Sequence, residues 1–376
     1  MKKLKNLGLC ATFLLALAAC GGGGGGNTAQ TPSPTPNPLL VQATSYLNAK
    51  TLGFGNARLP PHAKLAHTFA DFKRNGTQQL FMATQVYDVN QPRANAQPGQ
   101  FKFYNRNADG TYQEDTTLLA DRTGCIHPRK AIVADFNQDG RPDILVACHG
   151  FDATPFPGEK SALLMSKSDG TYAKFFMDEA GFNHAATAGD LHGDGYPDLV
   201  LTDNTINYAP YVLINNKNGS FTKRSDLLPS GLKFSSTFSV ELVDFNGDGK
   251  LDLWIAGHEW EQGGAPTIYL NPGNGNFSAA NPTVLPAVPN EGVVLDMVFH
   301  NNHIYMLCTS GGDGSFYKSA VVQKVAYPSL SSSVIYNSNR TPFNGQAWLT
   351  WVPWMLVIDG KLISTSDRFS GFGVTP

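Results

Sequence analysis

The residues best suited to chemistry form an acidic loop that occurs three times, at residues 135–143 (DFNQDGRPD), 190–198 (DLHGDGYPD) and 244–252 (DFNGDGKLD). Every copy has aspartate at its first, fifth and ninth positions and glycine at its sixth, and two copies have asparagine at the third. Closely spaced carboxylate and amide oxygens supply the six to eight ligands that Ca²⁺ prefers. The glycine permits the left-handed backbone of a sharp bend. The pattern therefore predicts calcium-binding loops.

Apolar runs flank these loops, such as residues 131–134 before the first copy and residues 144–147 after it. Short apolar runs bounded by turn residues predict strands, so each loop should join the two strands of a hairpin. An EF-hand would need flanking helices and a glutamate twelve residues into the loop. The copies recur about every 55 residues, a period that indicates a propeller or another repeat array.

The three loops closely resemble the FG-GAP/VCBS repeats of integrin α-chain propellers and of bacterial surface proteins. The resemblance implies a β-propeller in which a calcium loop joins neighbouring strands of a blade. It also implies the ligands, which are the side chains at positions one, three, five and nine and the backbone carbonyl at position seven. They are Asp135, Asn137, Asp139, Arg141 and Asp143; Asp190, Asp194, Tyr196 and Asp198; and Asp244, Asn246, Asp248, Lys250 and Asp252. His192 departs from this pattern, and because imidazole is a poor ligand for a hard cation, we expect the middle site to be the weakest.

A second repeated signal is a glycine turn followed by an aromatic residue. It occurs at Asp109-Gly110, Asp169-Gly170, Asn218-Gly219, Asn274-Gly275 and Asp313-Gly314. Such pairs are preferred in tight hairpins, so each unit should contain an inner hairpin with the acidic loop and an outer hairpin with this turn. Residues 71–79 (DFKRNGTQQ) form a degenerate copy in which Lys73 and Gln79 replace oxygen ligands. We expect a hairpin without metal there.

The fold predicted from these units is all-β, a propeller of four-stranded antiparallel blades that spans residues 39–376. Further inner hairpins are expected at residues 293–307 and 351–364, which gives six blades, with seven as the alternative. Residues 39–58 would then supply the outer strands that the last blade lacks. Closing the ring in this way leaves no exposed sheet edge.

The first 38 residues predict an export signal, a lipid anchor and a spacer. Residues 1–19 have the lysines and apolar run of an export signal. The Leu17-Ala18-Ala19-Cys20 sequence resembles the lipobox of bacterial lipoproteins, which implies a lipid on Cys20 and anchorage in a bacterial envelope, in the outer membrane. An ordinary cleaved signal with an incidental cysteine is the alternative. Residues 20–38 are rich in glycine and proline and would form a spacer.

Composition narrows the functional classes. Only 15% of the residues are charged and the net charge is −2, which argues against nucleic acid as a partner because binding it needs a basic face.

Cys125 and Cys148 flank one predicted hairpin, so we expect them to pair and leave Cys308 reduced. Three buried unpaired cysteines are the alternative.

The loops that leave the second strand of each intact blade carry the candidate ligand-binding residues, which are His149, Asp203, His258, Glu259 and Trp260. Trp260 would stack on a sugar while the polar residues bind its hydroxyls. His127, His149, His184 and His258 would form a transition-metal or lyase site if they converge. The sequence has no serine-hydrolase elbow, zinc-protease helix or phosphate loop.

These observations favour a calcium-stabilised, envelope-anchored module that binds carbohydrate or a protein and is not an enzyme. The alternatives are an envelope lyase or hydrolase acting on polysaccharide at the axial face, and a purely structural assembly partner.

Overall fold

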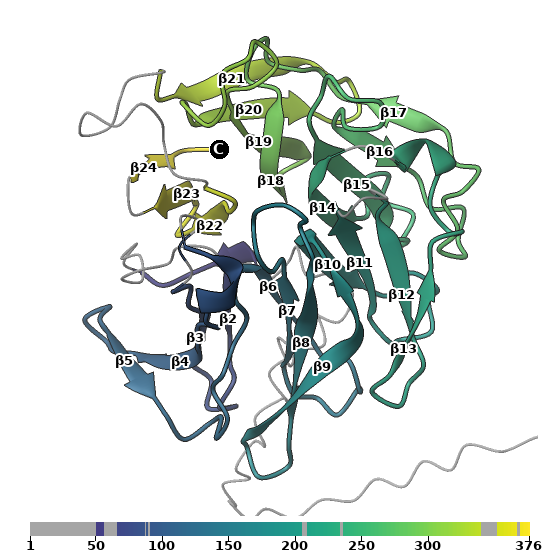
Figure 1. Cartoon of the computed structure of the whole chain (residues 1–376). Helices are drawn as coiled ribbons and strands as arrows, with labels where there is room; N and C mark the ends of the chain where they lie inside the picture. The colour runs from purple at the N-terminus through teal and green to yellow at the C-terminus, as the bar shows by residue number, and fades with distance from the viewer. Residues whose placement is uncertain are drawn as a thin grey trace, which may run out of the picture. The chain divides into compact units, whose positions relative to one another are not determined.

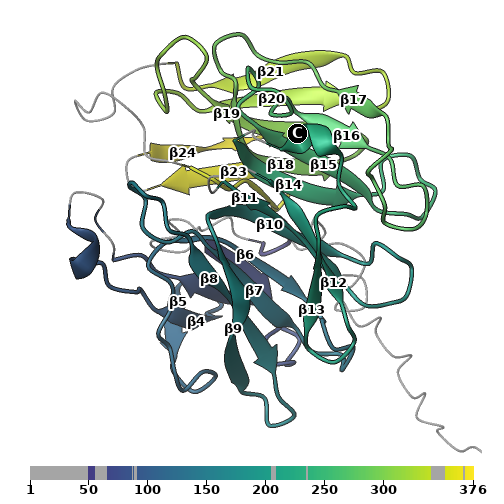
Figure 2. The same cartoon turned by 45° about the vertical axis from the view of Figure 1, so that its right-hand side comes forward.

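The computed structural model describes residues 50–55, 66–86, 88, 91–204, 209–233, 236–339, 352–366 and 369–376. Over these residues the chain forms six four-stranded sheets, arranged as the blades of a β-propeller (Figures 1 and 2). The predicted all-β fold and the count of six blades are confirmed. The predicted signal, Cys20 and the spacer lie outside the described residues. Among the described residues, no helix has the length and apolar character needed to cross a bilayer.

Blades one to five each use four consecutive strands, in order from the axis outward. Blade one contains β2 (Ala66–Ala70), β3 (Gln79–Ala83), β4 (Phe101–Arg106) and β5 (Tyr112–Asp115). Blade two contains β6 (Pro128–Ala134), β7 (Asp143–Cys148), β8 (Glu159–Ser166) and β9 (Tyr172–Gly181). Blade three contains β10 (Asn183–Gly189), β11 (Asp198–Asp203), β12 (Tyr211–Asn215) and β13 (Phe221–Arg224).

Blade four contains β14 (Thr237–Val243), β15 (Asp252–Gly257), β16 (Thr267–Tyr269) and β17 (Pro282–Val284). Blade five contains β18 (Val293–His300), β19 (His303–Thr309), β20 (Val321–Ala326) and β21 (Ser332–Asn337). Blade six contains β1 (Thr51–Leu52), β22 (Leu356–Ile358), β23 (Lys361–Ser366) and β24 (Phe369–Val374). Two short 3₁₀ helices, Arg93–Asn95 and Ser230–Leu232, lie in the connections.

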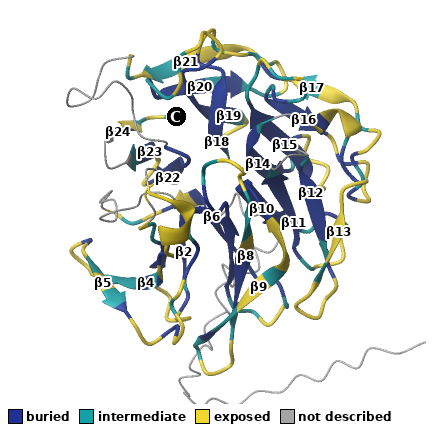
Figure 3. Ribbon diagram, in the orientation of Figure 1, coloured by how far each residue is buried: buried dark blue, intermediate teal, exposed yellow. Residues whose placement is uncertain are grey.

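Burial falls from the inner strands to the outer ones (Figure 3). All residues of β6 and β7 are buried, because both faces of an inner strand pack against neighbouring blades. Strands covered on both faces read as continuous apolar runs, and residues 131–134 of β6 and 144–147 of β7 are such runs. The outermost strand β13, in contrast, has no buried residue.

The last blade closes differently from the prediction. Thr51 and Leu52 pair in parallel with Val357 and Ile358, so β1 is the innermost strand of blade six and not an outer one. The predicted hairpin through Asp359 is real, but it joins the second and third strands, and the C-terminal residues supply the fourth. The inner position is therefore left for the N-terminal segment. The Asp359 carboxylate accepts the backbone N–H groups of Phe54 and Gly55, which fixes the end of β1.

One of the five predicted glycine turns lies in a different connection from the one expected. Four of the five predicted copies join the third and fourth strands of blades one to four, as expected. The fifth, Asp313-Gly314, lies between β19 and β20, so it belongs to the connection between the second and third strands of blade five. An Asp-Gly pair fits any tight turn with positive φ, and the sequence alone does not say which hairpin it closes.

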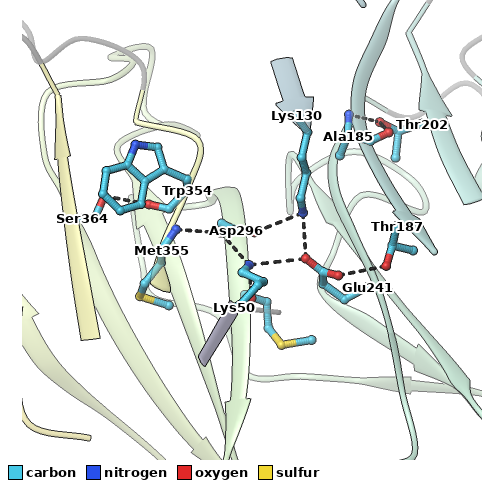
Figure 4. A network of polar contacts seen from close by, with 11 residues as sticks. Lys50, Lys130, Ala185, Thr187, Thr202, Glu241, Asp296, Trp354, Met355 and Ser364 are labelled. Carbon is cyan, nitrogen blue, oxygen red and sulfur yellow. Dashed lines mark hydrogen bonds and ion pairs between the residues drawn. The ribbon is translucent and has the colours of Figure 1, made fainter. Parts of the chain in front are cut away.

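A buried ion network joins the inner strands at the centre of the ring (Figure 4). Lys50 Nζ lies 2.7 Å from Asp296 Oδ2 and 3.3 Å from Glu241 Oε1, and Lys130 Nζ lies 2.7 Å from the same Glu241 oxygen. Thr187 donates to the other Glu241 oxygen, so five blades contribute to one network. Despite burial, the two ammonium groups hold the pKa of Asp296 below its usual value. Two carboxylates can be buried here because two lysines neutralise them.

Candidate functional site

The acidic loops join the first and second strands of blades two, three and four, as predicted. In the blade-two loop, Asp135 Oδ1 accepts the N–H of Asp139 at 3.0 Å and Oδ2 accepts the N–H of Gly140 at 2.7 Å. The first aspartate makes the same pair of bonds in the other two loops. The sixth-position glycines have φ angles of 78°, 89° and 81°, which side chains with a Cβ rarely adopt. The first aspartate and the glycine therefore curl each loop.

The ninth aspartate anchors each loop to the end of the third strand of its own blade or, in blade four, to Asn271 just beyond it. Asp143 Oδ1 accepts the N–H of Ser166 at 2.7 Å, and Oδ2 accepts the N–H of Phe136 at 2.9 Å. Asp198 and Asp252 make the equivalent bonds. Burial raises the pKa of Asp143 to about 7 and that of Asp252 to about 6. These carboxylates are fixed in place and are costly to keep charged without a nearby cation.

The donor set in these loops fits a hard cation. Apart from His192 in the middle loop, the predicted ligand positions offer oxygen atoms, and a carboxylate oxygen that accepts one N–H keeps a further lone pair. The third- and fifth-position side chains are partly or fully exposed, so an ion could reach them from solvent. The residues that would hold Ca²⁺ are the predicted ones, and in each of these blades they lie on the connection between the first and second strands and at the start of the second.

The middle loop differs from the other two through His192. Its Nδ1 lies 2.8 Å from Asp198 Oδ2, so the imidazole points toward the ninth aspartate. The hydrogen bond with Asp198 raises the pKa of His192. Lys217 Nζ also lies 3.1 Å from Asp194 Oδ2. Two of the three carboxylates in this loop thus have a side-chain nitrogen as a partner, in addition to the backbone N–H groups.

The degenerate loop of blade one forms the predicted hairpin, and Gln79 makes hydrogen bonds within it. Gln79 Nε2 donates to Asn75 Oδ1 at 3.1 Å and to the Thr77 carbonyl at 2.8 Å. Lys73 reaches Asp115 Oδ2 at 2.8 Å. The Gln79 amide therefore donates to oxygens within the loop, whereas the Lys73 ammonium group reaches out of the loop to the end of β5.

The end of the ring that carries the loops between the second and third strands is here called the axial face. Three histidines, His127, His149 and His184, converge there. The predicted Cys125–Cys148 disulfide is confirmed, with the two Cα atoms 5.9 Å apart, and Cys308 is reduced and buried. Next to it, the N–H of His149 donates to the His127 carbonyl at 2.9 Å, and the two rings lie 4.8 Å apart. The disulfide and this bond hold the entry to β6 against the end of β7.

A hydrogen-bonded chain links these histidines to blade three. His149 Nε2 lies 3.2 Å from His184 Nε2 and 3.2 Å from Arg129 Nη2. Asn204 Nδ2 lies 3.0 Å from His184 Nδ1. A neutral His149 with its proton on Nδ1 can accept at Nε2 from Arg129 or from His184, and a neutral His184 can accept at Nδ1 from Asn204. Burial lowers the pKa of His127, His149 and His184 well below the usual value, which keeps them neutral.

Aromatic rings continue this cluster across blades three to five. Consecutive members have ring centroids between 4.5 and 5.8 Å apart, in the order His184, Phe238, His258, Trp260 and Phe316. His258 stacks on Trp260 with an interplanar angle of 16° and bonds to Glu261 Oε1 at 2.8 Å. Trp260 is 43% exposed and Phe316 39%. The row therefore leads from a buried centre to an exposed aromatic surface.

The predicted ligand-binding residues separate into two groups. His258, Glu259 and Trp260 follow β15 together, and partial burial raises the pKa of the Glu259 carboxyl. His149 belongs to the histidine cluster. Asp203 lies near it, because its Oδ1 accepts the N–H of Phe182 at 3.0 Å and the Phe182 ring contacts the rings of His149 and His184. Phe238 and Phe316 were not predicted, since only packing shows that they complete the row.

Two hollows lie away from this face. One of about 480 Å³ lies between the acidic loops of blades three and four and is lined by Asp190, His192 and Asp244. Another of about 270 Å³ lies between the outer strands of blades two and three, beside Phe176 and Tyr211.

Comparison with known proteins supports the repeat. A family model described as the FG-GAP-like repeat matches residues 190–255, which contain the second and third acidic loops. The chain is a repeat β-propeller with an FG-GAP-like unit. A search of curated proteins gives no match.

Solved structures similar to this chain include two rhamnogalacturonan lyases. The Bacillus licheniformis lyase PL11 is 12% identical, with 82% of this chain and 71% of that one covered and a TM-score of 0.36. The lyase YesW is 14% identical, with 83% and 72% covered and the same TM-score. At this level of similarity, the function has to be argued from the chain's own residues.

Proposed function

We propose that this propeller is a calcium-stabilised binding module whose axial face binds carbohydrate. The observation that carries the proposal is Trp260, which is 43% exposed, stacks on His258 and lies beside Phe316. An exposed indole offers an apolar plane for one face of a sugar ring. The Glu259 carboxylate and the imidazole of His258 are polar groups in the same segment that suit hydroxyl groups.

Calcium would act on the fold and not on the sugar. The three intact loops place their oxygens on the hairpins between first and second strands, whereas Trp260 follows a second strand. Binding of an ion to the folded loops alone stabilises the folded protein by mass action. The degenerate loop supports this proposal by contrast, because it replaces oxygens with Lys73 and Gln79.

Anchorage in a bacterial envelope is part of the same proposal. It rests on the export signal, Cys20 and the spacer that follows. A lipid on Cys20 would hold the module at a membrane surface without a spanning helix. Metabolic labelling with palmitate tests this point, since incorporation should occur in the native chain and be absent from Cys20→Ala.

A glycan array probed with the full chain in calcium tests the binding function. We expect binding to one family of glycans, and Trp260→Ala should reduce it at least about tenfold, because the stacking surface is lost. Phe176→Ala is the matched control, since Phe176 is also exposed but lies on the outermost strand of blade two. An array without any binding, or equal binding by the Trp260→Ala variant, would contradict the proposal.

The second candidate function is a polysaccharide lyase or hydrolase, and the convergence of His127, His149 and Arg129 favours it. A catalytic base must reach a proton on its substrate. His149 is fully buried, whereas Trp260 is exposed, so binding is the better supported function. Release of new chain ends from a glycan that the array identifies, lost in His149→Gln, would establish the enzyme instead.

A further inference from the structure

The histidine cluster of the axial face carries a second inference, which is independent of glycan binding and of the calcium loops. His127, His149 and Asp152 each offer one ligand atom, and these atoms all lie within 4.8 Å of one another. Two imidazoles and one carboxylate suit a borderline divalent cation such as Zn²⁺ better than a hard ion such as Ca²⁺.

Arg129 already occupies the position of a cation in this group. Its Nη2 lies 3.2 Å from His149 Nε2 and 3.2 Å from Asp152 Oδ2. The guanidinium thus donates to an imidazole nitrogen and a carboxylate oxygen, the same kinds of atom that would coordinate a zinc ion. A Zn²⁺ ion binds such atoms at about 2.0–2.2 Å, so the ligands would need to move inward by roughly 1 Å.

The backbone around these ligands is held in place from several sides. The disulfide joins Cys125 to Cys148, one residue before His149. The Glu159 carboxylate accepts the N–H groups of Ile126 and His127, at 2.9 and 3.4 Å. Preorganised ligands lose less conformational entropy when an ion binds, which favours a specific site.

An ion could enter from the side of Asp152. The Asp152 side chain is 35% exposed, whereas that of Arg129 is only 6% exposed. The His127 and His149 side chains are buried, so the exposed carboxylate of Asp152 is the part of the site that solvent reaches.

We propose that His127, His149 and Asp152 form a binding site for a zinc-type divalent cation, and that the Arg129 guanidinium takes the place of the ion when the ion is absent. Binding would replace the contacts that His149 Nε2 now has with Arg129 and His184. A fourth coordination position would remain for water or a ligand group.

Titration of the full chain with Zn²⁺ alone, by calorimetry at neutral pH with excess calcium present, tests the site. We expect about one zinc ion per chain, and a weakening of at least about 100-fold in His127→Gln and in His149→Gln. Arg129→Met should instead tighten zinc about tenfold or more, because a buried positive charge beside the ion is removed. His303→Gln is the control, since His303 lies on the β18–β19 hairpin.

Melting curves without zinc check that each variant folds, and if His149→Gln does not fold, His127→Gln and Arg129→Met decide. A wild-type chain that binds no zinc would overturn the proposal. So would zinc binding that survives both histidine variants, or an Arg129→Met variant with weaker zinc binding than the wild type.

Discussion

At the scale of single residues, His192 distinguishes the middle acidic loop from its sisters. Its position in the loop was visible in the sequence, but the direction of its side chain was not. The imidazole bonds to Asp198 Oδ2 at 2.8 Å and so uses an oxygen of the ninth aspartate. It also contributes no oxygen of its own, whereas Asn137 and Asn246 do so in the other loops.

We predict that His192→Asn strengthens calcium binding at the middle loop. The change removes the bond to Asp198 and adds an amide oxygen, and ligand number tunes calcium affinity. The reverse change in blade four, Asn246→His, should weaken that site. Calcium titration by calorimetry measures both variants, and an unchanged affinity in each would mean that the third position does not contact the ion.

The row from His184 to Phe316 illustrates the limit of sequence reasoning at this scale. His258, Glu259 and Trp260 were predicted because they are adjacent in the chain and follow a strand. Phe238 was missed, although its ring lies 4.8 Å from His184 and 4.7 Å from His258. An apolar residue in a strand reads as core, and only the packing of neighbouring blades shows that it bridges two histidines.

At the scale of elements, the hairpins were predictable because each has a local signal. Aspartate spacing identified three inner hairpins and the degenerate fourth, and Asp-Gly or Asn-Gly pairs identified four outer ones. Asp313-Gly314 was assigned to the wrong connection, since the same pair closes different tight turns. The acidic loops identify their hairpins more specifically, because their pattern requires four polar residues at fixed spacing.

The disulfide is the main covalent constraint on an element. Replacing both cysteines, as Cys125→Ser with Cys148→Ser, should lower the free energy of unfolding by about 3 kcal/mol, because the bridge closes a loop of 23 residues in the unfolded chain. Denaturant unfolding of both proteins, with and without a reductant, measures this. The reductant should destabilise the wild type only, and an equal effect on the double variant would show that another group responds.

At the scale of the whole molecule, closure of the ring was the feature that the sequence could not place. β1 has only two residues, and nothing local in Thr51–Leu52 marks an innermost strand. The C-terminal segment supplies three of the four strands of blade six, and β1 takes the remaining, innermost place. That place is defined only when the whole ring is assembled. The six-blade count survived this error because each blade was identified from its own hairpins.

We predict that Lys50→Met destabilises the ring by about 3–5 kcal/mol, because it leaves the buried carboxylates of Glu241 and Asp296 with Lys130 as their remaining lysine. Lys167→Met is the matched control, since Lys167 pairs with Asp169 at the surface and should unfold like the wild type. Urea unfolding compares the two. Equal midpoints for both variants would mean that the network does not secure closure.

The central claim is that three intact loops bind calcium and thereby stabilise the propeller that presents the axial face. Equilibrium dialysis against calcium, with the bound metal counted, tests it most directly. We predict about three ions per wild-type chain, about two in Asp248→Ala and about three in Asn75→Ala, which changes the degenerate loop. Removal of calcium by a chelator should lower the melting temperature, and added calcium should restore it. A wild-type chain that binds no calcium, or melts at the same temperature with and without chelator, would contradict the account.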